Sequence, residues 1–96
     1  MTRRPELDES YRRWLREIGH HVATARAKMG WTQAKASLQC GLDIKQYQDI
    51  EHGRRPISTR TLFAVAVGMG VLPEDLTRGV NKAAPASPKP TAKPQP

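Results

Sequence analysis

Apolar residues recur at steps of three and four over the first third of the chain. This spacing places them on one face of a long amphipathic helix that ends at Gly30, since glycine tolerates the left-handed conformation after a helix. The apolar positions are Tyr11, Trp14, Ile18, Val22, Ala25 and Met29, with Leu15 beside them. No segment alternates with a period of two, so we predict an all-α protein without a sheet.

Capping residues predict four shorter helices after the first. Ser, Thr and Asp before a helix accept hydrogen bonds from its free backbone N–H groups, and proline fits the first turn. The signals are Thr32 before a helix over residues 33–39, Asp43 before one over 44–51, Ser58 before one that ends at Gly70, and Pro73 opening the last. We therefore predict five helices in total.

Composition divides the chain into three parts. Residues 81–96 contain five prolines and three lysines but no large apolar residue, so they cannot bury enough surface to offset the entropy of folding. We predict a disordered, partly polyproline-like tail there. The remainder is predicted to comprise an N-terminal extension over residues 1–10 and one helical domain over residues 11–80.

The chain is strongly basic, because its 96 residues carry a formal net charge of +7. Such an excess suits a polyanionic partner, which is either a nucleic acid or an acidic membrane surface. No apolar stretch approaches the roughly 20 residues that cross a bilayer, and the N-terminus lacks the apolar core of a signal peptide. We expect a soluble cytoplasmic protein that does not bind a membrane.

The sequence does not indicate catalytic or metal-binding chemistry. His20 and His21 are adjacent, and adjacent residues do not share a helix face, so we expect no metal site. No Ser–His–Asp arrangement and no glycine-rich phosphate loop is visible, so we expect no enzyme activity, no catalytic residue and no cofactor. Trp14 and Trp31 lie at apolar-stripe or staple positions and are expected in the core.

The second and third predicted helices are joined by a short turn that contains Gly41. A short helix, a tight turn with glycine and a second capped helix make a helix-turn-helix unit, whose second helix can enter the DNA major groove. A generic helical hairpin fits the same spacing, so this pattern alone leaves both interpretations open.

A longer series of residues, in register, narrows the choice. It comprises Ile18-Gly19, Val22, Ala25-Arg26, Gly30-Trp31-Thr32-Gln33, Gly41-Leu42, Tyr47, Ile50-Glu51, Gly53, Ser58, Leu62, Ala66, Gly70-Val71 and Leu76. This series resembles the Cro/phage-repressor (Cro/C1-type) class of helix-turn-helix regulators. The resemblance covers residues 18–76 and implies a five-helix domain that binds double-stranded DNA and regulates transcription, most simply as a repressor.

The chain departs from the family pattern at several places. Ala36-Ser37 stands where the family usually carries Leu-Ala, and Leu38 falls at a normally exposed position. Cys40 occupies a position that is usually alanine, so we interpret it as a small buried residue.

The resemblance also implies roles for individual residues. Gln33 would bond a phosphate and support the recognition helix, and Arg26 would form an ion pair with Glu51. The residues that would face the base edges are Ile44, Lys45, Gln48 and Asp49. Gln46 and His52 would lie near the DNA backbone, and Arg54 and Arg55 would follow the phosphates. Lysine can donate to guanine, glutamine can pair with adenine, and isoleucine can contact a thymine methyl group. Asp49 is ambiguous, since it would either accept from cytosine N4 or repel a phosphate.

The expected partners are DNA and a second copy of the chain, and one alternative function stays open. A single domain makes few base contacts, so we expect a homodimer that reads two half-sites about 34–36 Å apart. The expected interface is the surface around Val71, Leu72, Leu76 and Val80. The alternative function is an antitoxin or a protein-docking module on the same scaffold.

Overall fold

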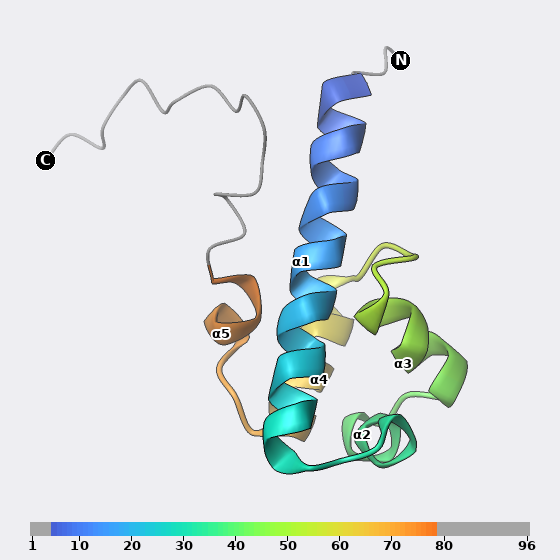
Figure 1. The fold of residues 1–96 in the computed structure, drawn as a ribbon, viewed down its shortest axis with the longest axis vertical. Helices are drawn as coiled ribbons and strands as arrows, with labels where there is room; N and C mark the ends of the chain where they lie inside the picture. The colour runs from blue at the N-terminus through green and yellow to red at the C-terminus, as the bar shows by residue number, and fades with distance from the viewer. Residues whose placement is uncertain (1–4, 79–96) are drawn as a thin grey trace, which may run out of the picture.

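The computed structural model describes residues 5–78, which form five α-helices and no strand (Figure 1). The helices are α1 (Pro5–Met29), α2 (Gln33–Cys40), α3 (Ile44–Glu51), α4 (Thr59–Met69) and α5 (Pro73–Thr77). The all-α prediction is confirmed within this range. Helix α1 begins at Pro5, inside the segment assigned to an extension, and the predicted tail over 81–96 lies outside the described residues.

The predicted capping residues make the expected hydrogen bonds. Thr32 Oγ1 accepts from the backbone N–H of Lys35 at 3.0 Å, and Ser58 Oγ accepts from that of Thr61 at 3.0 Å. Asp43 Oδ1 accepts from the N–H of Gln46 at 2.7 Å, so α3 begins where the sequence places it. Each of these helices therefore starts at a position fixed by local chemistry.

The core lies where the C-terminal half of α1 meets the other helices. Its largest fully buried side chains are Val22, Tyr47, Val65, Met69 and Leu76. Helix α1 packs against α3 and α5, while α2 packs against α3 and α4. Cys40 is buried as expected, and burial raises the pKa of its thiol.

Two aromatic residues at the start of the α1 stripe are not core residues. Helix α1 extends well past the other helices at its N-terminal end (Figure 1). Trp14 keeps 39% of its surface exposed and Tyr11 keeps 44%, so the expectation of a core Trp14 is wrong. The apolar stripe continues beyond the helices available to cover it. Trp31, by contrast, is partly buried and packs against the core.

The position of Leu76 differs from the prediction that it lies at a dimer interface. Its side chain is only 1% exposed, because α5 lies across α1 and α4 and inserts Leu76 into the core. Val71 is also partly buried against the core, while Leu72 is exposed and Val80 lies outside the described residues. Leu76 is therefore not available to an interface, and of the four predicted residues only Leu72 is exposed in the part of the chain that the structure describes.

Among the described residues, no helix is both long enough and apolar enough to span a bilayer.

Candidate nucleic-acid interface

Helix α3 is joined to α1 and α2 through the carboxylate of Glu51. Arg26 donates from Nε to Glu51 Oε2 at 2.6 Å and from Nη2 to Oε1 at 3.2 Å. Gln33 Nε2 donates to Oε1 at 2.9 Å, and the Tyr47 hydroxyl donates to Oε2. The ion pair expected between Arg26 and Glu51 is therefore present, within a larger network that includes all three helices.

The charges in this network reinforce one another. Burial opposes ionisation of Glu51, but hydrogen bonds from Arg26, Tyr47 and Gln33 outweigh it and lower the pKa of the carboxyl group. Burial and the neighbouring carboxylate raise the pKa of Tyr47, which stays a neutral donor. The hydrogen bond to Glu51 raises the pKa of Arg26. The end of α3 is thus held by an ionised carboxylate whose acceptors are satisfied.

Gln33 links the two helices of the helix-turn-helix unit a second time. Its side-chain oxygen accepts a hydrogen bond from Gln48 Nε2 at 3.1 Å, while its nitrogen donates to Glu51. Gln48 is partly buried as a result. The expectation that Gln33 supports the recognition helix matches these contacts. In the free protein, the amide of Gln48 is held in place beside α2.

Asp49 does not face outward, contrary to the sequence-based expectation. Its side chain is 7% exposed and lies within 3.2 Å of Lys45 Nζ, 3.6 Å of Arg54 Nη1 and 3.3 Å of Arg55 Nε. Burial opposes its ionisation, but the hydrogen bond from Lys45 and the charges of Arg55 and Arg54 lower its pKa. Asp49 therefore gathers three cations on one surface and is not placed to read a base.

The remaining predicted residues form one exposed surface along α3 and the loop after it. Ile44, Lys45, Arg54 and Arg55 are exposed, and Gln46 is partly buried. His52 is exposed at the C-terminal cap of α3, where its Nδ1 lies 2.8 Å from the carbonyl oxygen of Gln48. Helix α3 lies at the edge of the molecule, on the opposite side of α1 from α5 (Figure 1). This surface combines cations with polar and apolar groups on an accessible helix.

An exposed apolar surface on the neighbouring helices was not predicted. Leu38 on α2 is 79% exposed, and Phe63 and Val67 on α4 are each 62% exposed. These three residues, which we name the α2–α4 patch, border a groove of about 610 Å³ that also includes Arg60. The sequence did contain a signal for this patch. Phe63 and Val67 are four residues apart and are not part of the apolar series that is buried on α4.

Three solved structures of regulatory proteins are similar in fold to this chain. The restriction-modification controller protein C.AhdI from Aeromonas hydrophila superposes with a TM-score of 0.63 at 24% identity, over 65% of this chain and 94% of that one. The clp gene regulator ClgR from C. glutamicum gives 0.65 at 22% identity, over 76% and 96% of the two chains. The hypothetical transcription factor NHTF from Neisseria gives 0.62 at 28% identity, over 66% and 74%.

Sequence comparison gives the family. No curated protein sequence matches the chain. The family model for helix-turn-helix proteins matches residues 22–76, which is more than half of the chain and contains the whole Glu51 network. Members of this class are DNA-binding regulators of transcription and not enzymes. This protein therefore belongs to the helix-turn-helix family of Cro/C1-type DNA-binding transcriptional regulators.

Proposed function

We propose that the protein binds specific sequences of double-stranded DNA by placing α3 in the major groove. The observation that carries this proposal is the Glu51 network, which fixes α3 to α1 and α2 while the opposite face of α3 stays exposed. A reading helix must keep its side chains in register with base edges, and such bracing provides that rigidity.

The exposed residues of this face have the chemistry for base recognition. Lys45 would donate to guanine O6 and N7, and Ile44 would contact a thymine methyl group. Gln48 would pair with adenine N6 and N7 after exchanging its hydrogen bond with Gln33. Each good bidentate contact discriminates between bases by about 1–3 kcal/mol.

The surrounding polar residues would hold the DNA backbone. Arg54 and Arg55 would follow the phosphates, Gln46 and His52 would lie beside them, and the amide of Gln33 would bond a phosphate. Phosphate contacts fix position and orientation but carry no sequence information. Asp49 would act indirectly, because it holds Lys45, Arg54 and Arg55 on one surface.

We propose repression in the cytoplasm as the mode of regulation. A compact domain bound across a promoter blocks polymerase sterically and needs no further activity. The similar solved structures are those of a controller protein, a gene regulator and a hypothetical transcription factor, which supports a regulatory role in general.

We propose that the active form is a homodimer that reads two half-sites about 34–36 Å apart. Because Leu76 is buried, we assign the interface to the α2–α4 patch, whose three side chains are each more than half exposed. In sedimentation velocity, the wild type should dimerise and Phe63→Glu should be monomeric. Leu72→Asp serves as the matched control on the surface that the sequence suggested, and its dimerisation should be unchanged.

A second candidate function, protein docking or toxin neutralisation, is favoured by the same patch. Exposed apolar surface of this kind marks protein interfaces. Sedimentation distinguishes the two candidates, because a regulator that dimerises buries the patch against the second copy of the chain. A wild-type chain that stays monomeric at high micromolar concentration would contradict the dimer and favour a different protein partner.

Selection of bound duplexes from a random DNA pool tests the main proposal. The expected result is enrichment of an inverted repeat whose half-sites are one helical turn apart, about 10–10.5 base pairs from centre to centre. Recovery of random sequences with no enriched motif would contradict sequence-specific binding.

A further inference from the structure

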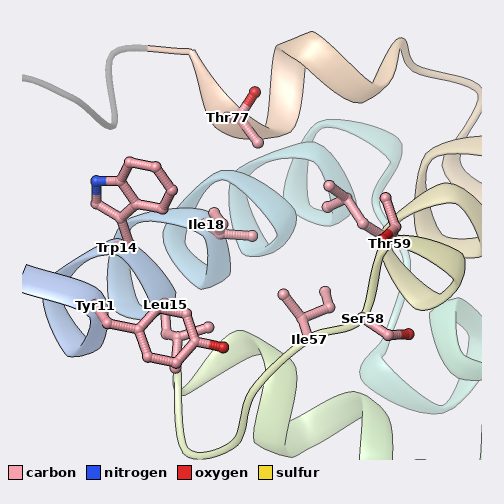
Figure 2. Close-up of a pocket in the computed structure, with 9 residues that line it drawn as sticks. Tyr11, Trp14, Leu15, Ile18, Ile57, Ser58, Thr59 and Thr77 are labelled. Carbon is pink, nitrogen blue, oxygen red and sulfur yellow. The ribbon is translucent and has the colours of Figure 1, made fainter. Parts of the chain in front are cut away.

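A pocket of about 450 Å³ lies between the N-terminal half of α1, the start of α4 and α5. Figure 2 shows Tyr11 and Trp14 on α1 at one end of the pocket, with Ile57 opposite and Thr77 on α5 above. The lining residues are aromatic, aliphatic or hydroxyl-bearing, and none of them is charged. The pocket offers no cation to hold a phosphate or an acidic group, and it suits a segment that contacts it through apolar rings and backbone carbonyl groups.

The aromatic end of this pocket is not explained by DNA binding. Tyr11 and Trp14 precede residue 22, where the family match begins, and neither takes part in the Glu51 network. Both rings are partly exposed, although large aromatic side chains gain most from burial. Neither the Tyr11 hydroxyl nor the Trp14 indole N–H has a hydrogen-bond partner among residues 5–78. The site therefore offers two aromatic faces and two donors.

This combination matches the chemistry of proline-rich segments. Such a segment has few backbone N–H donors but keeps all its carbonyl acceptors, and its stiff extended form loses little entropy on binding. Proteins recognise it with aromatic-lined grooves, where rings pack against proline. Tyrosine and tryptophan supply both the ring face and the hydrogen bond to a carbonyl oxygen.

The chain itself contains a segment of this kind, a few residues after the last residue that lines the pocket. Residues 85–90 read Pro-Ala-Ser-Pro-Lys-Pro, and six residues separate them from Arg78. Thr77, the last residue of α5, lines the pocket. Six extended residues span roughly 20 Å, which is enough to turn back and reach a site that begins at Thr77. A short tether also gives an effective concentration in the millimolar range, so a weak contact suffices.

We propose that the pocket at Tyr11 and Trp14 binds the proline-rich segment 85–90 of the same chain. The rings of Pro85, Pro88 and Pro90 pack against the two aromatic side chains, and carbonyl oxygens of the segment accept from the Tyr11 hydroxyl and the Trp14 indole. The proposal does not depend on DNA binding, because the site lies outside the α3 surface.

Nuclear Overhauser spectroscopy on the labelled full chain tests this. The expected result is a set of cross-peaks between Trp14 ring protons and proline ring protons, lost in the triple variant P85A/P88A/P90A. The double variant P94A/P96A is the matched control and should retain them. All five substitutions come after Arg78 in the sequence, so they change none of the residues that form the five helices, and we expect the fold to be kept.

Two outcomes would overturn the proposal. One is the absence of cross-peaks together with a Trp14 indole resonance that does not move in the triple variant. The other comes from a mixture of labelled and unlabelled chains: cross-peaks that join Trp14 to the prolines of a different molecule would show exchange between copies. Cross-peaks confined within single molecules are the expected result.

Discussion

At Glu51, one carboxylate accepts hydrogen bonds from side chains on three helices: Arg26 on α1, Gln33 on α2 and Tyr47 on α3. Side chains of α1, α2 and α3 therefore meet at a single group. Removing its charge leaves a partly buried guanidinium without its counterion, and this loss outweighs the hydrogen bonds that an amide would keep.

We expect Glu51→Gln to lower the free energy of unfolding by about 3 kcal/mol, at the lower end of the range for such pairs because Arg26 stays partly exposed. Thermal melting checks this, with an expected fall in Tm of more than roughly 10 °C. Glu9→Gln makes the same chemical change at an exposed position of α1 and should leave Tm unchanged. A Glu51→Gln melt that overlays the wild type would contradict the structural role of the pair.

The lowered pKa of Glu51 predicts that the stability of the fold decreases at acidic pH. Because the pKa of Glu51 is lowered in the folded state, its contribution is fully present above the unfolded pKa of about 4.3. That contribution is lost as the pH falls through the lower pKa of the folded state. Urea denaturation at about pH 6, 4 and 3 should show the difference between wild type and Glu51→Gln shrinking. A difference in unfolding free energy between the two proteins that stays constant from about pH 6 to about pH 3 would contradict the lowered pKa of Glu51.

At the scale of helices, one close approach fixes how α1 packs on α3, and a second fixes how α4 packs on α2. A Cβ atom added at Gly19 would lie 2.4 Å from the carbonyl oxygens of both Ile50 and Glu51. These atoms are backbone, so they cannot move without displacing the end of α3. At Gly68 an added Cβ would lie 2.6 Å from the carbonyl oxygen of Gln39, where α4 meets α2.

We expect Gly19→Ala to destabilise the fold by about 2–3 kcal/mol, although alanine favours helices, because overpacking outweighs the gain in propensity. Urea denaturation measures the change. His20→Ala, at the next and exposed position of α1, is the control and should stay near wild type. A Gly19→Ala protein as stable as the wild type would show that α3 is free to shift.

The helices themselves followed from the sequence, because caps act within a few residues. Thr32, Asp43 and Ser58 bond to N–H groups three residues ahead, so local chemistry alone places these helix starts. The burial of Asp49 did not follow from the sequence. It depends on the path of the loop that brings Arg54 and Arg55 back over α3. Leu76 and Trp14 likewise depend on which helices cover them.

At the scale of the molecule, charge and apolar surface are separated. The cations of the α3 surface gather around Asp49, the α2–α4 patch is apolar, and the pocket at Trp14 carries no charge. DNA, a second copy and the proline-rich segment can therefore each use a different face. This division was beyond the reach of sequence analysis, since it depends on which residues of different helices meet.

The α3 surface predicts a steep salt dependence of DNA binding. Lys45, Arg54 and Arg55 would contact phosphate or bases, and each ionic contact contributes about −0.9 to the slope of log affinity against log salt. The proposed homodimer carries these three cations twice, so its slope should be about −5, and Arg55→Ala, which removes one contact from each protomer, should reduce the magnitude by about 2. Arg78→Ala, at the residue that follows α5, should leave the slope unchanged. Affinity independent of salt would contradict DNA binding by this surface.

The central claim is that α3 reads bases while the loop after it holds phosphates. The most direct measurement is the affinity of wild type, Lys45→Ala and Arg55→Ala for the selected site and for every single-base variant of it. Lys45→Ala should lose about 1–3 kcal/mol of discrimination at one base pair, with preferences elsewhere unchanged. Arg55→Ala should weaken binding to all sequences alike. If both variants lower all affinities in the same proportion, α3 is not the reading helix.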